Sequence, residues 1–507
     1  MNIELRGISK HFGPVKANQD INLEIRAGEV IGLLGENGAG KSTLMNILSG
    51  LYRQDAGEIL IDGRPTAFDG PGDSIAAGIG MVHQHFMLVP VFSVVENVIL
   101  GVEPTRGADY LDLDAARAQV QNINSRYGMD VPTESLIMDL PVGIQQRVEI
   151  LKVLFRSADV LILDEPTAVL TPQEVEEFFG IVRALRDAGK AIVFITHKLH
   201  EILEIADRVS VLRQGKIVGD GDPSQFSEAD LAEMMVGRPV SFSVGRGSPE
   251  TGAPVLELSD VSMFDENQDS RLSDVSMFVH EGEIVGVAGV QGNGQTELVD
   301  AIAGLSSIAG GGIRFCGTDI TGRSVRQRHQ MGIAHIPEDR QKSGMVAGFS
   351  VAENMVLNRY YDEPIARGVQ IDWRQAQQQA AEACMKFDVR TPNVFLGAGS
   401  LSGGNQQKMV VARELERAVK LVVASQPTRG VDVGSIEFIH KQLVSCSEQG
   451  NGVLIISSEL DEILDLSDRI YVMFEGQITA EFDNRQRDAD RNAIGLAMAG
   501  ARGTRAA

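Results

Sequence analysis

The sequence has 507 residues, enough for two to four domains that each bury a sizeable core. A net charge of −23 and an aromatic content of only 5% disfavour a nucleic-acid-binding protein, which would carry a basic surface or stacking aromatics. The hydrophobic content of 43% is ordinary for a globular protein, and no run approaches 18 uninterrupted apolar residues. We therefore expect no membrane-spanning helix.

The cysteines and the amino terminus give two further expectations. Cys316, Cys384 and Cys446 have no metal-ligand spacing and form an odd number, which predicts reduced, mostly buried thiols in a reducing compartment. The first residues lack the basic region and apolar run of a signal peptide.

The strongest motif of the first half is a P-loop, G-x-x-x-x-G-K-[ST]. Residues 29–34 predict a buried strand that enters it, and residues 43–48 predict a helix that leaves it and ends near Gly50. Lys41 should reach the β- and γ-phosphates of a nucleotide, and the Ser42 hydroxyl should bind Mg²⁺. The nucleotide-binding candidates are Gly35, Glu36, Asn37, Gly38, Ala39, Gly40, Lys41, Ser42, Thr43 and Phe12, whose ring suits adenine stacking and a core position equally well.

The rest of the first half predicts alternating strands and helices. Residues 3–25 predict edge strands, and residues 88–155 predict a helical subdomain. Residues 160–163 form a short apolar run, typical of a parallel strand buried on both faces. A helix should follow from Pro172, capped by Thr171 and Glu174 and ending at Gly189, and then a strand over 191–195. This order predicts an α/β fold with a mostly parallel sheet.

Polar residues follow these strands. Asp164 stands where a P-loop ATPase holds its Mg²⁺-bound carboxylate, and Glu165 is placed to orient or deprotonate the attacking water. His197 follows the strand over 191–195 and could contact the γ-phosphate, although a lone histidine is more often structural. Gln84 carries little chemistry by itself.

The second half of the chain repeats the first at an offset of 254 residues at the P-loops and 261 beyond residue 140. Residues 282–289 echo 28–35, and 350–354 echo 93–97. We expect a first domain over 1–240, a Gly-, Ser- and Pro-rich linker over 241–254, a second domain over 255–500 and a flexible tail over 501–507.

The run Leu401-Ser402-Gly403-Gly404-Asn405-Gln406-Gln407 opens a helix and can present a serine and backbone N–H groups to phosphate. Together with the P-loop, Gln84, Asp164-Glu165 and His197, it makes both halves resemble the ATP-binding-cassette superfamily. The resemblance implies two tandem cassettes, each with a mostly parallel P-loop core sheet, an antiparallel β subdomain and a helical subdomain. It implies ATP and Mg²⁺ as cofactors, a metal site at Ser42, Gln84 and Asp164, and Lys41, Gln84, Glu165 and His197 as catalytic residues.

The two copies have diverged in a correlated way. Lys41, Gln84, Asp164, Glu165 and His197 of the first copy align with Gln295, Glu338, Ser425, Gln426 and Ser458 of the second, whose altered loop also includes Gly289, Gly294 and Thr296. The run over residues 401–407, called the signature, is intact in the second copy only. In the first copy Pro141 and Val142 replace its serine and first glycine. In the superfamily two cassettes pack head to tail, so the resemblance implies one complete composite site, formed by the first P-loop and the second signature.

Two fused cassettes without membrane spans resemble the energising subunit of bacterial sugar and nucleoside importers. Residues 140–147 and Ser425-Gln426 look more like the nucleoside branch than the ribose or xylose branch. The resemblance implies integral-membrane permeases as partners, a periplasmic or lipoprotein substrate-binding protein as an indirect one, and a place on the cytoplasmic face of the cell membrane. The alternatives are a simple-sugar importer and, less favoured, a soluble tandem cassette acting on ribosomes or DNA. The short linker and the charge of −23 weigh against the last.

Overall fold

The structure is a computed structural model. It describes residues 1–83, 86–106, 110–167, 170–196, 198–239, 251–265, 268–368 and 370–500. The chain divides into two compact units, Met1–Val240 and Ser241–Ala507. Most of the expected linker and all of the expected tail lie outside the described residues. No helix in the described part of the chain is long and apolar enough to cross a bilayer.

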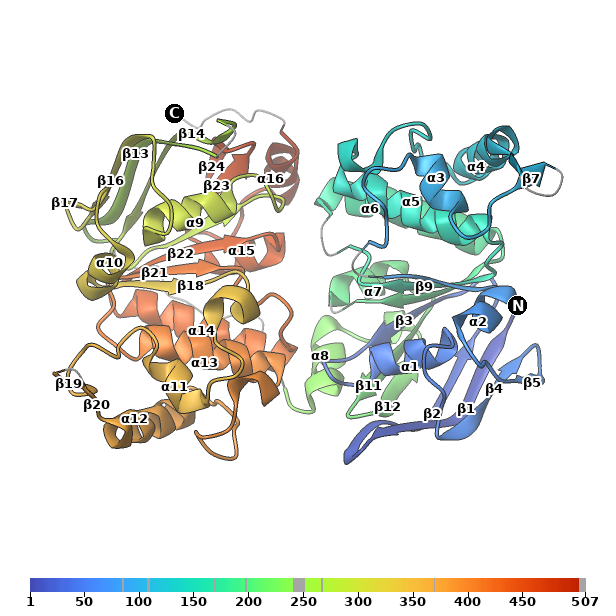
Figure 1. The fold of residues 1–507 in the computed structure, drawn as a ribbon, viewed down its shortest axis with the longest axis horizontal. Helices are drawn as coiled ribbons and strands as arrows, with labels where there is room; N and C mark the ends of the chain where they lie inside the picture. Colours follow the sequence, from blue (N-terminus) through green and yellow to red (C-terminus); the bar gives the residue numbers. More distant parts are fainter. Residues whose placement is uncertain are drawn as a thin grey trace. The chain divides into compact units, whose positions relative to one another are not determined.

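The first unit contains the following elements, labelled in Figure 1. They are β1 (Ile3–Phe12), β2 (Val15–Ile25), β3 (Val30–Leu34), α1 (Lys41–Leu48), β4 (Ala56–Ile61), β5 (Arg64–Thr66), α2 (Pro71–Ala76), β6 (Ile79–Val82), α3 (Val94–Ile99), β7 (Thr105–Arg106), β8 (Tyr110–Leu111), α4 (Leu113–Tyr127), η1 (Ile137–Asp139), α5 (Val142–Phe155), β9 (Val160–Asp164), α6 (Pro172–Asp187), β10 (Ala191–Ile195), α7 (Leu199–Ile205), β11 (Arg208–Arg213), β12 (Lys216–Gly221), η2 (Pro223–Gln225) and α8 (Glu228–Val236).

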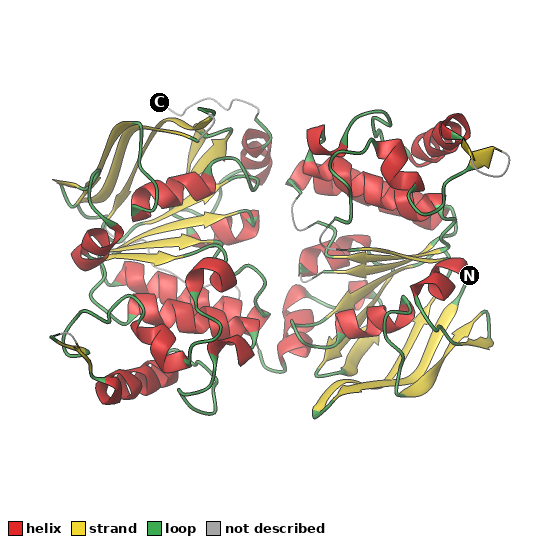
Figure 2. Ribbon diagram, in the orientation of Figure 1, coloured by secondary structure: helices red, strands yellow, loops and turns green. Residues whose placement is uncertain are grey.

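Two sheets organise this unit. The core sheet has the order β12-β11-β3-β10-β9-β6, and all its pairings are parallel except that of β11 with β12. Its central strands are buried along their whole length because helices cover both faces, which Figure 2 shows. The second sheet, β2-β1-β4-β5, is antiparallel. Helices α3, α4 and α5 form the helical part of the unit.

The second unit repeats this architecture. Its elements are β13 (Pro254–Phe264), β14 (Ser270–His280), β15 (Ile284–Ala288), α9 (Gln295–Ala303), β16 (Gly310–Phe315), β17 (Thr318–Asp319), α10 (Val325–Met331), β18 (Ile333–Ile336), η3 (Arg340–Gly344), α11 (Val351–Val356), β19 (Ala366–Arg367), β20 (Gln370–Ile371), α12 (Trp373–Lys386), η4 (Ala398–Ser400), α13 (Gly403–Leu415), β21 (Leu421–Ser425), α14 (Val433–Glu448), β22 (Gly452–Ser457), α15 (Leu460–Leu466), β23 (Arg469–Phe474), β24 (Gln477–Asp483) and α16 (Arg491–Met498). The core order β18-β21-β22-β15-β23-β24 matches that of the first unit. The expected α/β class is confirmed.

Two expectations about local structure need correction. The helix after the first P-loop begins at Lys41 rather than Thr43, because the loop's last glycine serves as its N-cap. Cys384 is buried and Cys446 partly buried, and burial raises the pKa of each thiol to about 11. Cys316, in contrast, is exposed because it lies in the tight turn between β16 and β17.

Candidate functional site

The first P-loop follows β3 at the carboxyl end of the core sheet, and two of its glycines are required by close backbone contacts. A Cβ atom at Gly35 would lie 2.4 Å from the Leu212 carbonyl oxygen, and one at Gly40 would lie 2.3 Å from that of Ala17. Gly40 has φ +108°, a conformation that side chains disfavour. The loop therefore wraps tightly enough to direct backbone N–H groups inward.

Lys41 is held inside this loop. Its Nζ donates to the carbonyl oxygens of Gly35 at 2.5 Å and Glu36 at 3.1 Å. Burial lowers the pKa of the Lys41 ammonium, and the carboxylates of Glu165, Asp164 and Glu36 act in the opposite direction. Because an ammonium group only donates, Lys41 leaves the N–H groups of the loop to another acceptor.

Two carboxylates reach the same cleft from the end of β9. This strand neighbours β10, which in turn neighbours β3, so Asp164 lies at the sheet edge that carries the P-loop. Burial and the negative charge of Glu165 raise the pKa of Asp164, whereas Lys41 and His83 lower it. Glu165 adopts φ +47°, and its N–H donates to the Ile195 carbonyl at 2.8 Å. This strained turn fixes the backbone of Glu165 to the neighbouring strand.

The resulting cleft has a volume of about 570 Å³. Most residues predicted for the first site line it, namely Phe12, Glu36, Asn37, Gly38, Gly40, Lys41, Ser42, Thr43, Asp164 and Glu165. Gly35 and Ala39 belong to the same loop. Gln84 and His197 lie outside the described residues.

In the second P-loop, the side chain of Gln295 bonds to the loop backbone. Gln295 stands in the place of Lys41 and is buried. Its Nε2 donates to the Val290 carbonyl at 3.0 Å, and its Oε1 accepts the Asn293 backbone N–H at 3.1 Å. The amide thus replaces the lysine's bond to the loop without its positive charge, and it also accepts a backbone N–H of the loop.

The other altered residues of the second copy bond to one another. Glu338 accepts from the Thr296 hydroxyl at 3.2 Å and from Gln291 at 2.8 Å, and it forms a 2.6 Å ion pair with Arg429. Thr296 aligns with Ser42, so the hydroxyl expected to bind a metal in the first copy has a protein partner in the second. At the end of β21, Gln426 Oε1 lies 3.2 Å from the Ser458 hydroxyl.

The first two residues of the signature helix α13 are glycines, of which only the second, Gly404, aligns with a glycine in the first copy. A Cβ atom at Gly404 would lie 2.1 Å from Asp432 Oδ2, and one at its counterpart Gly143 would lie 2.6 Å from Glu174 Oε1. This glycine is kept in both copies because the helix packs closely there. Ser402 caps α13, whereas Pro141 gives α5 no side-chain cap. Leu401 precedes the cap and is buried.

Several residues that connect these motifs were not predicted from the sequence. The Gln407 amide donates to the Pro427 carbonyl at 2.9 Å, and Gln146 makes the same contact with Pro166 in the first unit. Glu201 is buried and accepts from Thr167 at 2.7 Å. The repetition of Gln146 and Gln407 in the two copies was the available signal.

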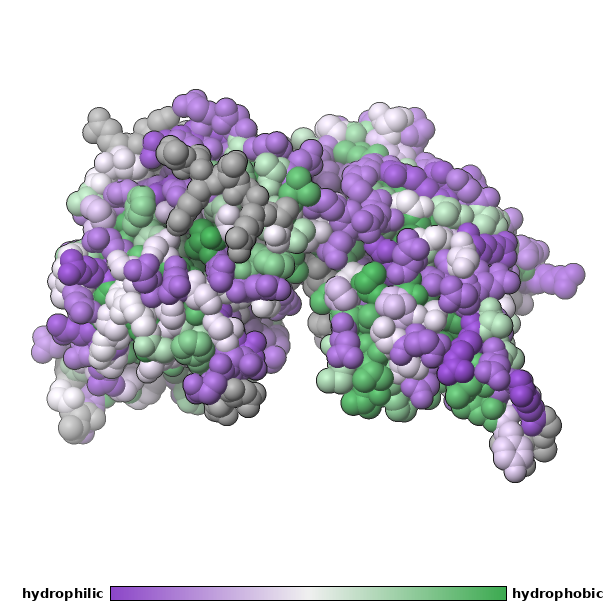
Figure 3. Space-filling model, turned by 90° about the horizontal axis from the view of Figure 1, so that it is seen from above, coloured by the Kyte–Doolittle hydropathy of each residue, from purple (hydrophilic) through white to green (hydrophobic). Residues whose placement is uncertain are grey.

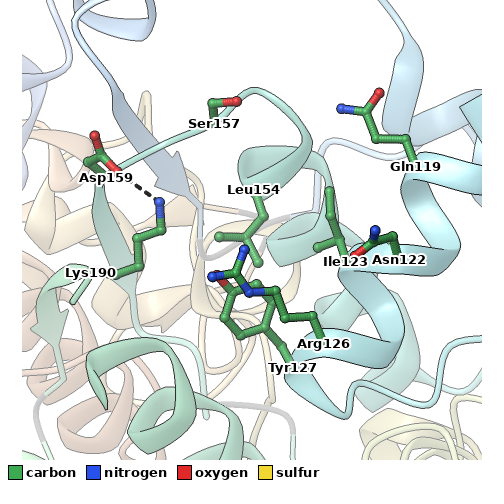
Figure 4. Close-up of a pocket in the computed structure, with 9 residues that line it drawn as sticks. All are labelled: Gln119, Asn122, Ile123, Arg126, Tyr127, Leu154, Ser157, Asp159 and Lys190. Atoms are coloured by element: carbon green, nitrogen blue, oxygen red, sulfur yellow. Dashed lines mark hydrogen bonds and ion pairs between the residues drawn. The ribbon is translucent and has the colours of Figure 1, made fainter. Parts of the chain in front are cut away.

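A second cleft, of about 430 Å³, lies elsewhere in the first unit (Figure 4). Asp159 and Lys190, which precede β9 and β10, contribute to it and pair at 2.8 Å, as the dashed line shows. Because these residues lie at the amino ends of parallel strands, the cleft is at the sheet edge opposite the P-loop. It has none of the residues predicted for catalysis.

A P-loop and a strand-end carboxylate pair on a mostly parallel sheet define a P-loop nucleoside triphosphatase. The ABC transporter family model matches residues 18–168 and 272–429. The nucleoside import ATP-binding protein NupA of Lactococcus lactis subsp. cremoris is 48% identical over 94% of this chain and 94% of its own length. The guanosine import ATP-binding protein NupO of Bacillus subtilis is 46% identical over 98% and 97%. The glucose import ATP-binding protein TsgD13 of Haloferax volcanii is 45% identical over 98% and 96%.

The chain therefore belongs to the ABC transporter family, and the predicted resemblance is confirmed. It is an ATPase of that family with two cassettes in one chain.

Proposed function

We propose that this protein is the ATP-hydrolysing subunit of a bacterial importer, that its first unit carries the one hydrolysing site, and that it drives uptake of a nucleoside. The observation that carries the proposal is the contrast between the two P-loops. Lys41, Asp164 and Glu165 line one cleft of the first unit, whereas the aligned Gln295, Ser425 and Gln426 of the second unit carry no charge.

In the first site, each residue has a distinct task. Lys41 and the loop N–H groups neutralise the charge that develops on the phosphates, and Glu165 orients or deprotonates the attacking water. Mg²⁺ is commonly held by one or two carboxylates together with nucleotide phosphates, and Ser42 and Asp164 in this cleft fit that pattern. When bound, the ion would offset negative charge on the β- and γ-phosphates. Gln84 and His197 keep the metal and γ-phosphate roles assigned from the motifs.

We also propose that the signature at Leu401, Ser402, Gly403 and Gly404 completes this site. The sequence sorts the parts in a way that independent drift does not explain: the copy with the catalytic residues has the damaged signature, and the other copy has the reverse. The second P-loop and the first signature would then form the partner site that does not hydrolyse ATP.

The proposed partners are membrane permeases, and each unit has an apolar surface suited to them. In the first unit the segments around Met87 and Met138 adjoin, because the Met138 N–H donates to the Pro90 carbonyl at 3.0 Å. Met87 is 66% and Met138 62% exposed, and Val91 between them is also exposed. On the face shown in Figure 3, hydrophobic residues gather in separate patches among hydrophilic ones. The exposed group of Met87, Val91 and Met138 suits a protein partner.

The second unit exposes a similar group. Val346, Phe349 and Phe395 are exposed, and the Ala398 N–H donates to the Phe349 carbonyl at 2.8 Å. These residues follow Glu338 in the chain as the first group follows Gln84. The repetition favours one docking surface per unit, defined by Met87, Val91 and Met138 in the first unit and Val346, Phe349 and Phe395 in the second.

Nucleoside is the proposed substrate because two relatives with 46–48% identity are named for nucleoside or guanosine import. The glucose-import relative, at 45% identity, keeps a simple sugar as the second candidate. A substrate-binding protein outside the membrane would deliver either one.

The test is to express the chain with the permeases and binding protein encoded beside it, and to measure uptake of labelled guanosine and ribose. We expect guanosine uptake and membrane-bound chain, with Met138→Asp releasing the chain from membranes. Met385→Asp is the matched control, because Met385 is 77% exposed on α12, outside both docking surfaces. Ribose uptake without guanosine uptake would establish the sugar alternative. A chain that stayed off membranes, or that sedimented with ribosomes, would contradict an importer.

A further inference from the structure

Arg340 connects three segments of the second unit. It begins η3, directly after Glu338 and Asp339. Its Nη1 donates to the Arg429 carbonyl at 2.8 Å and its Nη2 to the Gly430 carbonyl at 3.1 Å. The planar guanidinium thus bridges two consecutive carbonyls of the turn that follows β21.

The same guanidinium borders the signature. A Cβ atom at Gly403 would lie 2.8 Å from Arg340 Nη2 and 3.4 Å from the Gly430 carbonyl oxygen. The absent side chain of Gly403 therefore leaves the space that Arg340 fills. Ser402, the N-cap of α13, precedes this contact directly.

The turn is held from its other side as well. The side chain of Arg429 pairs with Glu338 at 2.6 Å, while its carbonyl accepts from Arg340. Asp339 caps η3 by accepting the N–H groups of Gln341 at 2.9 Å and Lys342 at 3.1 Å. Hydrogen bonds and an ion pair therefore join the segment 338–340 to the turn at 429–430, and the start of α13 packs against Arg340 and Gly430. We call these three segments the signature assembly.

The first copy does not have these residues. Phe86 aligns with Arg340, Val142 with Gly403, and Ala168 and Val169 with Arg429 and Gly430. A phenylalanine has no donor for the turn, and a valine would fill the space beside the helix. The fold itself thus does not need the arginine, which accompanies the intact signature.

We propose that Arg340 is a positioning residue for ATP hydrolysis, which holds the signature residues Ser402 and Gly403 in the arrangement that completes the first site. This inference rests on the proposed function, because the signature must serve the nucleotide held by Lys41. In this proposal, Glu338 and Arg429 of the altered second site hold the turn that Arg340 bridges, and thereby support the signature of the hydrolysing site.

The test measures steady-state ATP hydrolysis by the purified transporter, together with equilibrium binding of a fluorescent ATP analogue. Arg340→Ala should lower kcat by about 10- to 100-fold, because misplacement of a positioning group costs rate on that scale. Binding at the first P-loop should change by less than about threefold, because none of its residues is altered. Arg340→Lys should give an intermediate kcat, since an ammonium group cannot bridge both carbonyls as a guanidinium does.

Arg417→Ala is the matched control. Arg417 is partly buried like Arg340, and it also donates to two backbone carbonyls, those of His329 and Ile333. It should leave kcat within about twofold of wild type, because these contacts lie outside the signature assembly. An equal loss of kcat in Arg417→Ala and Arg340→Ala would overturn the positioning role.

Gly403→Ala separates this inference from the proposal beneath it. If Gly403→Ala lowers kcat and Arg340→Ala does not, the positioning role fails while the composite site stands. If neither variant lowers kcat, the composite site fails too. We expect both to lower kcat, with the double variant losing less than the product of the two factors because they disturb one contact.

Discussion

Lys41 and Gln295 occupy the same position in the two P-loops, and their hydrogen-bonding capacities decide what each loop can do. The ammonium group donates to two carbonyls and accepts nothing. The amide donates once, to Val290, and accepts the Asn293 N–H, so Gln295 bonds to its own loop through both a donor and an acceptor. The replacement of the lysine by glutamine therefore removes the positive charge that would neutralise a phosphate.

Exchange of Lys41 and Gln295 tests whether the lysine is required for hydrolysis. Lys41→Gln should lower ATP hydrolysis by about 100-fold or more, because the phosphates lose their neutralising charge. Gln295→Lys should add no second activity, because Ser425 and Gln426 supply neither a metal-binding carboxylate nor a base. Steady-state ATPase rates decide the matter. Substantial activity in Lys41→Gln, or a raised rate in Gln295→Lys, would contradict the account.

At the scale of elements, both units join the start of the central core strand to a neighbouring strand by a glutamate–arginine pair. Glu283 and Arg469 are 2.8 Å apart and nearly fully buried. Glu29 and Arg208 are 2.9 Å apart and 14–17% exposed. Burial opposes ionisation of Glu283, but hydrogen bonding and charge from Arg469 hold its pKa below the ordinary value.

Arg469→Met should lower the free energy of unfolding by about 3–5 kcal/mol, because it removes the guanidinium from a buried carboxylate that keeps, among the described residues, only its contacts with His280. Arg208→Met, its counterpart in the first unit, should cost about 1 kcal/mol, since that pair is partly solvated. Urea unfolding at neutral pH measures both. Equal losses of unfolding free energy in Arg469→Met and Arg208→Met would show that burial of the pair does not determine the loss.

The same pair gives a pH dependence with a definite sign. Because the pKa of Glu283 is lowered in the folded state, its stabilising contribution is full above the unfolded pKa of about 4.5 and is lost as the pH falls through the folded value. In Arg469→Met the carboxyl group is buried without its cation, which favours protonation. The difference in unfolding free energy between wild type and variant should therefore narrow on acidification.

The elements themselves were largely predictable from the sequence, because their signals are local. Continuous apolar runs identified β3, β9 and β10, and the capping box at Thr171 and Glu174 fixed the start of α6. The repeat and the P-loop gave the two-cassette architecture. The hydrogen bonds of Arg340 to the turn at 429–430 were not predictable, since they join residues about 90 positions apart through backbone carbonyls. Likewise, only the packing around Gly404 distinguishes its role from that of Gly403.

At the scale of the whole molecule, the chain carries two copies of one architecture, between which we propose a division of tasks. The first unit has the residues that we assign to phosphate binding and catalysis, and the second has the intact signature and, beside it, Arg340. A duplicated ATPase in which only one site hydrolyses can lose the second set of catalytic residues without losing turnover. In the second unit, Glu338 and Arg429 pair with each other.

The most direct test of the central claim compares the two signatures in the purified transporter. Gly403→Val installs the first copy's residue in the second signature, and Pro141→Ser installs the second copy's residue in the first. With Glu165→Gln as the inactive reference, we expect Gly403→Val to lower ATP hydrolysis nearly to the reference rate, and Pro141→Ser to leave it within about twofold of wild type because its partner site lacks a base. A larger effect of Pro141→Ser than of Gly403→Val would contradict one hydrolysing site built from the first P-loop and the second signature.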